Sequence, residues 1–426
     1  MGDLFEDLEW RGLVHQVTDP AVAGLVDQGG LTVYIGFDPT ADSLHLGSLL
    51  PILALRRMQL GGHRPIALAG GGTGMIGDPS GRESERPLLT DEEVEANVAG
   101  IASQLERFLD FEAGPRQAIV ANNRQWLGAL GLIEFLRDVG KHFTVNQMIA
   151  KESVRVRLGE REQGISFTEF SYMLLQAYDF LHLSDSYGCR LQMGGSDQWG
   201  NITMGIDLVR RLRGNEVYGL TSPLLLKPDG TKYGKSETGT VWLDGTRTSP
   251  YALFQFLLRS DDSMVPALLR WYTFLPRSRI EELDELTRTR PERREAQRVL
   301  AREVVSLVHG EQEATRAERA AGVLFSEEIS TLDEATLLEV FADAPSSARP
   351  RSDLEPPGLA VVEALRDSGL VSSLSAARTT VSQGGAYVNN RRVGDPDQRL
   401  GVDDLISGRY AVLRRGKKDH HLLRFE

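Results

Sequence analysis

The sequence predicts an α/β protein whose doubly wound parallel sheet is followed by an all-helical region and a small α+β unit. Its first two-thirds alternates short apolar runs with helical patterns, which indicates parallel strands joined by helices. From Pro250 to about Phe341 the apolar residues recur with helical spacing. The last stretch, Leu359–Glu426, combines two helical patterns with short strand-like runs.

Strands and helices can be placed in order in the first part of the chain. Strands are expected at Leu31–Gly36, Arg64–Ala69 and Gln117–Asn122, and helices at Ser43–Leu60, Asp91–Phe111 and Leu132–Val139. Ser43 suits the N-cap of the first helix, because a serine hydroxyl accepts from the free N–H groups there. Ligands of doubly wound folds bind outside the carboxyl ends of the strands, so the segments after Gly36 and Ala69 are candidate binding loops.

Composition divides the chain into four segments. Residues 1–249 form the α/β domain, 250–342 a helical domain, 343–358 a linker, and 359–426 the small α+β domain. The linker is assigned because Asp343–Gly358 holds four prolines and few apolar residues.

The composition is that of a globular protein, with 41% hydrophobic residues over 426 positions. No uncharged apolar run reaches the roughly 18 residues that cross a bilayer, so no membrane partner is expected. The segment Met1–Arg11 lacks the apolar core of a signal peptide. The single cysteine, Cys189, excludes an internal disulfide and a cysteine-based zinc site, and it fits a cytoplasmic protein without a protein-bound metal site.

The charge is unevenly distributed. The whole chain carries −12, yet Pro357–Glu426 holds eleven Lys and Arg against eight Asp and Glu. The basic end is therefore the candidate for nucleic-acid contact. Its clustered cations are Arg391, Arg392, Arg414, Arg415, Lys417 and Lys418.

Two glycine-rich stretches resemble nucleotide motifs without meeting their requirements. Gly72–Gly77 has the spacing GxGxxG, but Asp78-Pro79 follows where a dinucleotide site needs a helix. Gly230–Ser236 has three residues between its glycines instead of the four of a P-loop. We therefore set aside both a nicotinamide site and a P-loop.

The segment Tyr34–Ser48 is a stronger candidate for phosphate binding. Asp38-Pro39-Thr40 ends the first strand, and His45 and Gly47 fall in the first turn of the next helix. Free N–H groups and the helix dipole favour phosphate there, and a glycine lets a flat ring approach the backbone. Taken alone, the segment is equally compatible with a helix start that carries an incidental histidine.

Several motifs together resemble one enzyme family. His45-Leu-Gly-Ser48 is similar to the HIGH signature of class I aminoacyl-tRNA synthetases, and Lys232–Ser236 (KYGKS) to their KMSKS loop. Gln192–Asn201 and Phe170–Asp179 resemble segments lining the amino-acid pocket of bacterial-type tyrosyl-tRNA synthetases. Ser375–Val388 resembles an S4-type RNA-binding module. The resemblance runs from about Leu31 to the C-terminus and implies a Rossmann-like catalytic domain.

The resemblance implies a tyrosine pocket. Tyr172, Gln176 and Asp179 stand at i, i+4 and i+7, on one face of a helix with apolar flanks. A solvated polar face is the alternative, but buried polar groups need partners, which a bound tyrosine supplies. By resemblance, Tyr172, Gln176 and Asp78 hold its ammonium, Tyr34 and Asp179 its phenol hydroxyl, and Gln198 its carboxylate.

The resemblance also implies an ATP site. Thr40 and His45 would hold the γ-phosphate, Ser48 would contact the adenosine, and Lys232, Lys235 and Ser236 would close over the pyrophosphate. Further ATP contacts are expected at Gly36, Asp38, Gly47 and Asp197. ATP is expected as a substrate, with Mg²⁺ accompanying it. Ser48 departs from the second histidine of HIGH, and Arg82 from a common lysine.

The implied function is that of a tyrosine–tRNA ligase, with tRNA(Tyr), L-tyrosine and ATP as partners and no DNA. The family is homodimeric, and 132–167 is the expected contact region. An RNA-binding protein without catalysis and a tryptophanyl-tRNA synthetase are the alternatives. The lysine pair of KYGKS argues against the first, and the Tyr34/Asp179 pair, which suits a phenol, against the second.

Overall fold

The computed structural model describes residues 4–78, 80, 89–112, 114–159, 165–227, 230–231, 233–236, 239–323, 327–342, 344–416 and 419–426. Its chain contacts define two compact units. The first comprises Met1–Thr248 and Ser260–Ala296, and the second Ser249–Arg259 and Gln297–Glu426. Residues 260–296 therefore pack with the α/β part, whereas the sequence grouped them with the helical domain.

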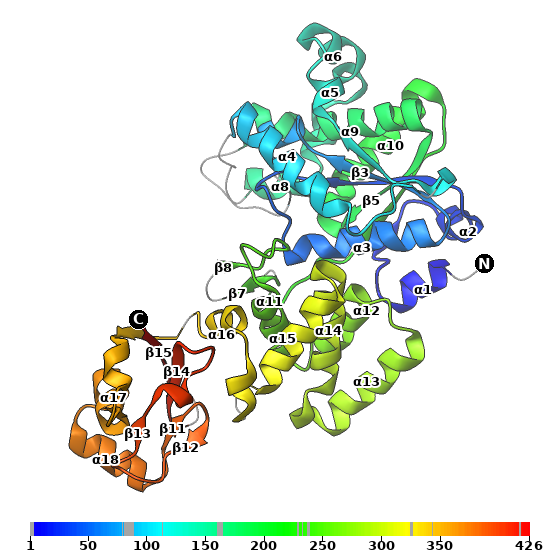
Figure 1. The fold of residues 1–426 in the computed structure, drawn as a ribbon. Helices are drawn as coiled ribbons and strands as arrows, with labels where there is room; N and C mark the ends of the chain where they lie inside the picture. The colour runs from blue at the N-terminus through cyan, green and yellow to red at the C-terminus, as the bar shows by residue number, and fades with distance from the viewer. Residues whose placement is uncertain are drawn as a thin grey trace. The chain divides into compact units, whose positions relative to one another are not determined.

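The first unit is built on a sheet of six described strands in the order β1-β6-β5-β2-β3-β4 (Figure 1). The strands are β1 (Gln16–Val17), β2 (Thr32–Phe37), β3 (Arg64–Ala69), β4 (Ile119–Asn122), β5 (Cys189–Gly195) and β6 (Tyr218–Ser222). All pairings are parallel except that of β1 with β6. The predicted doubly wound sheet is confirmed.

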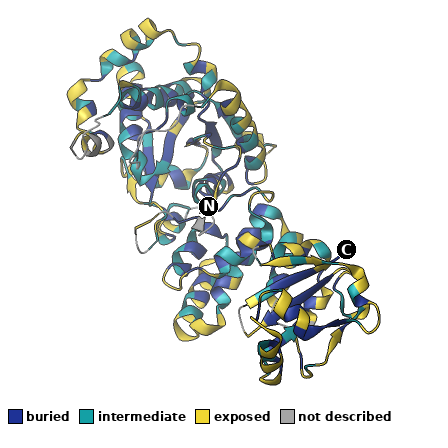
Figure 2. Cartoon of the chain, turned by 90° about the vertical axis from the view of Figure 1, so that its left-hand side faces the viewer, coloured by how far each residue is buried: buried dark blue, intermediate teal, exposed yellow. Residues whose placement is uncertain are grey.

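The first unit also contains helices, several of which pack directly on the strands. They are α1 (Leu4–Trp10), α2 (Ala21–Gln28), α3 (Leu46–Leu60), α4 (Asp91–Leu105), α5 (Arg124–Leu127), α6 (Leu132–Asp138), α7 (Val145–Ile149), α8 (Glu152–Gly159), α9 (Phe167–Tyr187), α10 (Trp199–Arg213), α12 (Val265–Tyr272) and α13 (Arg277–Thr289). In Figure 1, α3 lies on one side of the sheet and α9 with α10 on the other. Figure 2 shows the strands as the most deeply buried elements.

Two predicted helix limits are wrong. The first helix begins after His45, whose side chain caps it, and Ser43 instead bonds to Leu44 and Gln104. The acidic helix α4 ends at Leu105, although its helical pattern continues to Phe111.

The second unit contains α11 (Pro250–Leu258), α15 (Glu311–Val323), α16 (Glu334–Val340), α17 (Val361–Asp367) and α18 (Leu374–Ser382). It also includes α14 (Glu295–His309) from Gln297 onward. Its main sheet has the order β12-β11-β14-β15-β9. These strands are β9 (Ser346–Arg349), β11 (Ala386–Val388), β12 (Arg391–Arg392), β14 (Tyr410–Arg415) and β15 (Asp419–Phe425), and β10 (Leu359–Ala360) pairs separately with β13 (Arg399–Leu400).

The prediction of a linker at 343–358 is wrong, because part of this segment belongs to a sheet. Ser346–Arg349 forms β9, which pairs in parallel with β15 and adds a strand to the sheet. Proline-rich composition hid this, because the pairing partner lies more than seventy residues further along the chain.

No helix in the described part of the chain is long and apolar enough to span a membrane.

Candidate functional site

Two adjoining cavities open at the carboxyl ends of β2 and β5. Both are lined by Ile35 of β2, Pro51 of α3, and Gly194 and Gly195 at the end of β5. This is the edge at which parallel strands of doubly wound sheets present their loops to ligands.

A buried carboxylate, that of Asp179, lines the first cavity. Asp179 of α9 is 1% exposed. Its Oδ2 accepts from Asn123 Nδ2 at 2.9 Å, and its Oδ1 from Trp126 Nε1 at 2.7 Å. Burial raises the pKa of Asp179 to about 7, and these two hydrogen bonds oppose the rise because they favour the charged form. The carboxylate is therefore held in one orientation and keeps lone pairs for a ligand.

Two buried polar atoms of the first cavity have no hydrogen-bond partner among the described residues. They are the hydroxyl of Tyr34 and Oε1 of Gln192, and both side chains line the first cavity. Burial and the nearby charge of Asp179 raise the pKa of Tyr34 well above its usual range, so this hydroxyl is a donor at neutral pH. Unpaired buried polar atoms are costly, and a ligand with a hydroxyl would satisfy them.

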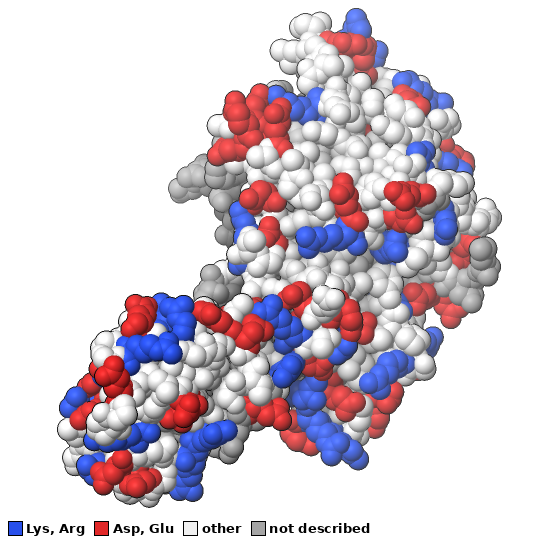
Figure 3. Space-filling view, in the orientation of Figure 1, with Lys and Arg blue, Asp and Glu red and all other residues white. Residues whose placement is uncertain are grey.

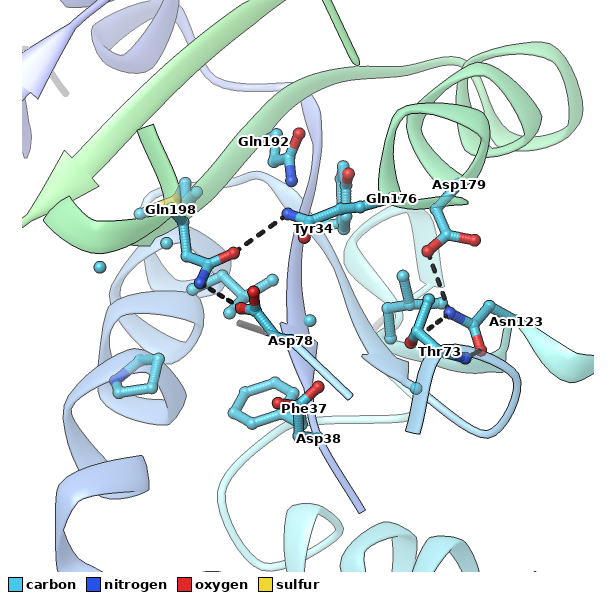
Figure 4. A pocket seen from close by; sticks show the side chains of 18 of the residues that line it. Tyr34, Phe37, Asp38, Thr73, Asp78, Asn123, Gln176, Asp179, Gln192 and Gln198 are labelled. Atoms are coloured by element: carbon cyan, nitrogen blue, oxygen red, sulfur yellow. Dashed lines mark hydrogen bonds between the residues drawn. The ribbon is translucent and has the colours of Figure 1, made fainter. Parts of the chain in front are cut away.

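The other end of the cavity holds a chain of amides and one carboxylate (Figure 4). Gln198 Nε2 donates to Asp78 Oδ2 at 2.7 Å, and Gln176 Nε2 donates to Gln198 Oε1 at 3.3 Å. Asn201 Nδ2 donates to Gln176 Oε1 at 3.0 Å. The network joins α9 and the start of α10 to the loop after β3, and it presents the charge of Asp78 to the cavity.

The second cavity is bordered by the start of α3. Thr40, His45, Gly47 and Asp197 line it. His45 Nδ1 accepts from the backbone N–H of Ser48 at 3.2 Å, which fixes the ring at the helix N-terminus. A Cβ on Gly47 would lie 3.0 Å from His45 Cε1, so this position keeps room for the ring. Free N–H groups at such a terminus attract phosphate.

The segment after β6 packs on the same helix start. Gly234 and Tyr233 line the second cavity, and Leu46 N donates to Val241 O at 2.8 Å. The hydroxyl of Tyr233 is buried and lies 2.8 Å from Ser260 Oγ. This places the backbone of the predicted KYGKS loop beside the HLGS segment.

The predicted residues divide between the cavities. Tyr34, Asp78, Tyr172, Gln176, Asp179 and Gln198 line the first, and so do Gly36 and Asp38, which the sequence assigned to ATP. Thr40, His45, Gly47 and Asp197 line the second. Among the described candidates Ser48 lines neither cavity, and its backbone N–H donates to His45 Nδ1 at the start of α3. The backbone of Lys235 and Ser236 forms β7 (Lys235–Ser236), paired with β8 (Gly239–Thr240), while Lys232 and Arg82 lie outside the described residues.

The sequence patterns singled out neither Asn123 nor Trp126, and they marked Thr73, Gln192 and Asn201 only as parts of the motifs Gly72–Gly77 and Gln192–Asn201. Asn123 directly follows β4, at the edge where Asp38 and Asp78 follow β2 and β3. Because ligands of such sheets bind outside the carboxyl ends of the strands, the position of Asn123 could have marked it as a site residue. Trp126 had no such signal, although its Nε1 donates directly to Asp179, because it lies in the short helix α5 outside every motif.

The candidate RNA-binding cations of the second unit differ in environment. Arg391 and Arg392 are exposed on β12, and Arg415 pairs with Asp419 at 2.6 Å. Arg414 does not fit the prediction of a cation presented to solvent, because it is 9% exposed and lies over the ring of Tyr387 at 3.7 Å. Lys417 and Lys418 lie outside the described residues. On the face of this unit in Figure 3, basic side chains alternate with acidic ones.

Comparison with known proteins agrees with this geometry. Residues 27–326 match the family model described as tRNA synthetases class I (W and Y), and residues 338–423 match a tyrosine–tRNA ligase SYY-like C-terminal domain. The fold, the paired cavities and this match define a class I tRNA synthetase.

Individual relatives show which family within this class of synthetases the chain resembles. The chain is 53% identical to the tyrosine–tRNA ligase of Roseiflexus castenholzii over 100% of both chains. It is 51% identical to that of Geobacillus stearothermophilus, over 99% of this chain and 100% of the relative. A truncated mitochondrial tyrosyl-tRNA synthetase of Aspergillus nidulans superposes with a TM-score of 0.68 at 33% identity, covering 76% and 94% of the chains. The chain belongs to the tyrosine–tRNA ligase family.

Proposed function

We propose that the chain activates L-tyrosine with ATP, releases pyrophosphate, and transfers tyrosine from the adenylate to the 3′-terminal adenosine of tRNA(Tyr). The observation that carries the proposal is the buried polar end of the first cavity. There Asp179 is fixed by two N–H donors, and the hydroxyl of Tyr34 is buried without a partner among the described residues.

The substrate hydroxyl would complete this end of the cavity. It donates to Asp179 and accepts from Tyr34, so a buried acceptor and a buried donor are both satisfied. Phenylalanine would leave them unpaired, a form of discrimination for which tyrosyl-tRNA synthetases are themselves the usual illustration. Tryptophan presents an N–H that only donates, so it would leave the Tyr34 hydroxyl unpaired.

The amide chain at the opposite end would hold the amino-acid head group. Asp78 supplies the charge for the ammonium, with Tyr172 and Gln176 as further partners. Gln198 already donates to Asp78, so its amide links the ammonium site to the site of the carboxylate. This orientation directs the tyrosine carboxylate toward Gly194 and Gly195, where the two cavities meet.

ATP would occupy the second cavity. The N-terminus of α3, with Thr40, His45 and Gly47, receives the phosphates, and Asp197 receives the ribose. Gly36 and Asp38 line the first cavity, so their contact with ATP would be at the junction where the α-phosphate meets the tyrosine carboxylate. The leaving pyrophosphate would be stabilised by the positive charges of Lys232 and Lys235 and by the hydroxyl of Ser236. Ser48 would hold His45 in place. Catalysis is then positioning and electrostatic stabilisation.

Mg²⁺ would enter with ATP. Magnesium bound to nucleotides is held largely by phosphates and water. Among the described residues, no three His, Cys, Asp or Glu side chains stand together as a metal site.

The rest of the chain would serve tRNA. Of the predicted helical domain 250–342, the parts that belong to the second unit, 250–259 and 297–342, would serve the anticodon side. The S4-like module 359–426 would bind RNA through Arg391, Arg392, Arg415, Lys417 and Lys418. Arg414 would act indirectly, by stacking on Tyr387 and donating to Asn390. The site of action is the cytoplasm, where tRNA is charged.

A second copy of this chain would cover the apolar surface of 132–167. Leu132, Ile133 and Phe167 are 70%, 74% and 77% exposed. Exposed apolar side chains gathered in one segment mark an interface. Light scattering of Ile133→Asp should show monomers, with Arg137→Gln on the same helix as the control that stays dimeric. A dimeric Ile133→Asp would move the interface elsewhere.

The test of function is tyrosine-dependent ATP–pyrophosphate exchange. The proposed enzyme exchanges with tyrosine, and much less with phenylalanine or tryptophan. Exchange with tryptophan alone would select the tryptophanyl alternative, and an absence of exchange with any amino acid would select the RNA-binding one.

A further inference from the structure

One face of α4 contacts the loop between β2 and α3 at successive points. Asn97, Gly100 and Gln104 are spaced by three and four residues, so they form one stripe along the helix. The loop, residues 38–45, carries Thr40 and His45 of the second cavity.

Gln104 secures the end of this loop. Its Oε1 accepts from the backbone N–H of Leu44 at 2.8 Å, and its Nε2 donates to Ser43 Oγ at 2.9 Å. Ser43 and Leu44 are buried. Since a buried N–H needs a partner, Gln104 determines where the residue before His45 can lie.

Asn97 and Gly100 secure the beginning and the middle. Asn97 Nδ2 donates to Pro39 O at 2.9 Å, directly before Thr40. A Cβ on Gly100 would overlap the carbonyl oxygen of Asp42 and lie 3.0 Å from its carbonyl carbon. The loop backbone therefore uses the space that a side chain at position 100 would fill.

The opposite side of the loop is also held. Asp42 forms an ion pair with Arg247, and Leu243 N donates to Leu44 O at 2.9 Å. The ring of Trp242 lies under the guanidinium of Arg247 at 4.7 Å and borders the second cavity. The loop is thus fixed between α4 and the segment 241–247.

We propose that Asn97, Gly100 and Gln104 are positioning residues that set Thr40 and His45 for the phosphates of ATP. Each hydrogen-bonding anchor holds the residue immediately before a phosphate-binding candidate, and both candidates are exposed while their anchored neighbours are buried. A phosphate clamp must be fixed before ATP arrives, because small misplacements of binding groups are costly in rate. This inference rests on the proposed function.

Gly100→Ala separates this role from a structural one. We expect the added Cβ to displace the backbone of Asp42, so a purely structural role would lower thermal stability without a selective change in the ATP kinetics. We expect the KM for ATP in pyrophosphate exchange to rise about tenfold or more, while the KM for tyrosine changes less than twofold. The matched control is Gly24→Ala in α2, where a Cβ would meet nothing within 4 Å.

Gln104→Met is the second variant, and it carries the test if Gly100→Ala reduces the yield of folded protein. It keeps the shape of the side chain, removes both hydrogen bonds and should raise the KM for ATP in the same selective way. Ser103→Met, exposed on the same helix, is its control.

His45→Ala, assayed in parallel, distinguishes a failure of the proposed phosphate site from a failure of the positioning role of α4. If His45→Ala leaves the ATP kinetics unchanged, the proposed phosphate site itself is wrong. If His45→Ala impairs exchange while Gly100→Ala and Gln104→Met behave like their controls, only the positioning role of α4 is refuted. Equal rises in the KM for ATP and for tyrosine would also refute it.

Discussion

Replacing Asp179 by asparagine removes one charge from the first cavity and preserves the size of the side chain. The carboxylate accepts from Asn123 and Trp126 through different oxygens. An asparagine has a single oxygen, so its NH₂ group must face one of these two donors. One buried N–H is then left without an acceptor, and the substrate hydroxyl loses a charged partner.

The magnitude follows from these two losses. An unsatisfied buried donor costs about 1–3 kcal/mol, and a hydrogen bond to a charged group contributes about 1.5–3 kcal/mol. Part of the first cost is already present without substrate. We therefore expect a loss of about 2–4 kcal/mol in the tyrosine-dependent step, or roughly thirty- to several-hundredfold in kcat/KM for tyrosine. The KM for ATP should change less than twofold.

Pyrophosphate exchange at varied tyrosine and ATP measures both effects. The control is Asp185→Asn on the same helix, since Asp185 pairs with Arg213 at the surface. The pH profile adds an independent readout, because burial raises the pKa of Asp179 to about 7. In the parent enzyme kcat/KM for tyrosine should fall as the pH drops below about 7, and this inflection should vanish in Asp179→Asn. A near-normal kcat/KM, or the same inflection in the variant, would refute the assignment of Asp179 to the phenol.

Four further predictions can be checked separately. Tyr34→Phe should leave the melting temperature equal or higher, since it removes an unpaired hydroxyl, yet lower kcat/KM for tyrosine about three- to tenfold; a lower melting temperature would show that the hydroxyl has a partner. Lys235→Ala should slow adenylate formation in stopped flow with little change in tyrosine affinity, and a change in affinity alone would place Lys235 in the amino-acid pocket. A chain ending near Asp343 should retain exchange but charge tRNA poorly and with weaker salt dependence, whereas unchanged charging would exclude the C-terminal part from tRNA binding. Burial lowers the pKa of His63, so the unfolded chain binds that proton more readily; stability to urea should decline below about pH 6.5, and this component should be absent in His63→Gln.

The sequence by itself determined the elements that depend on local pattern. The strands β2 and β3 and the helix α6 lie within a residue or two of their predicted places, because apolar runs and helical spacing are read from neighbouring residues. Motifs with fixed spacing likewise indicated which side chains could form a tyrosine pocket and a phosphate site, and the family comparison supports the class of enzyme that they implied.

Only the tertiary structure decided which distant residues complete these sites. Asn123 and Trp126 bond to Asp179 across more than fifty residues, and Gln104 bonds to Leu44 across sixty. The strand β9 inside a proline-rich segment, and His45 in place of Ser43 as the cap of α3, were decided in the same way. For Asp179, Leu44 and β9 the partner lies far along the chain, and Ser43 bonds to Gln104, sixty-one residues away, instead of capping α3. Folding brings the partners together, and no local pattern encodes the pairing.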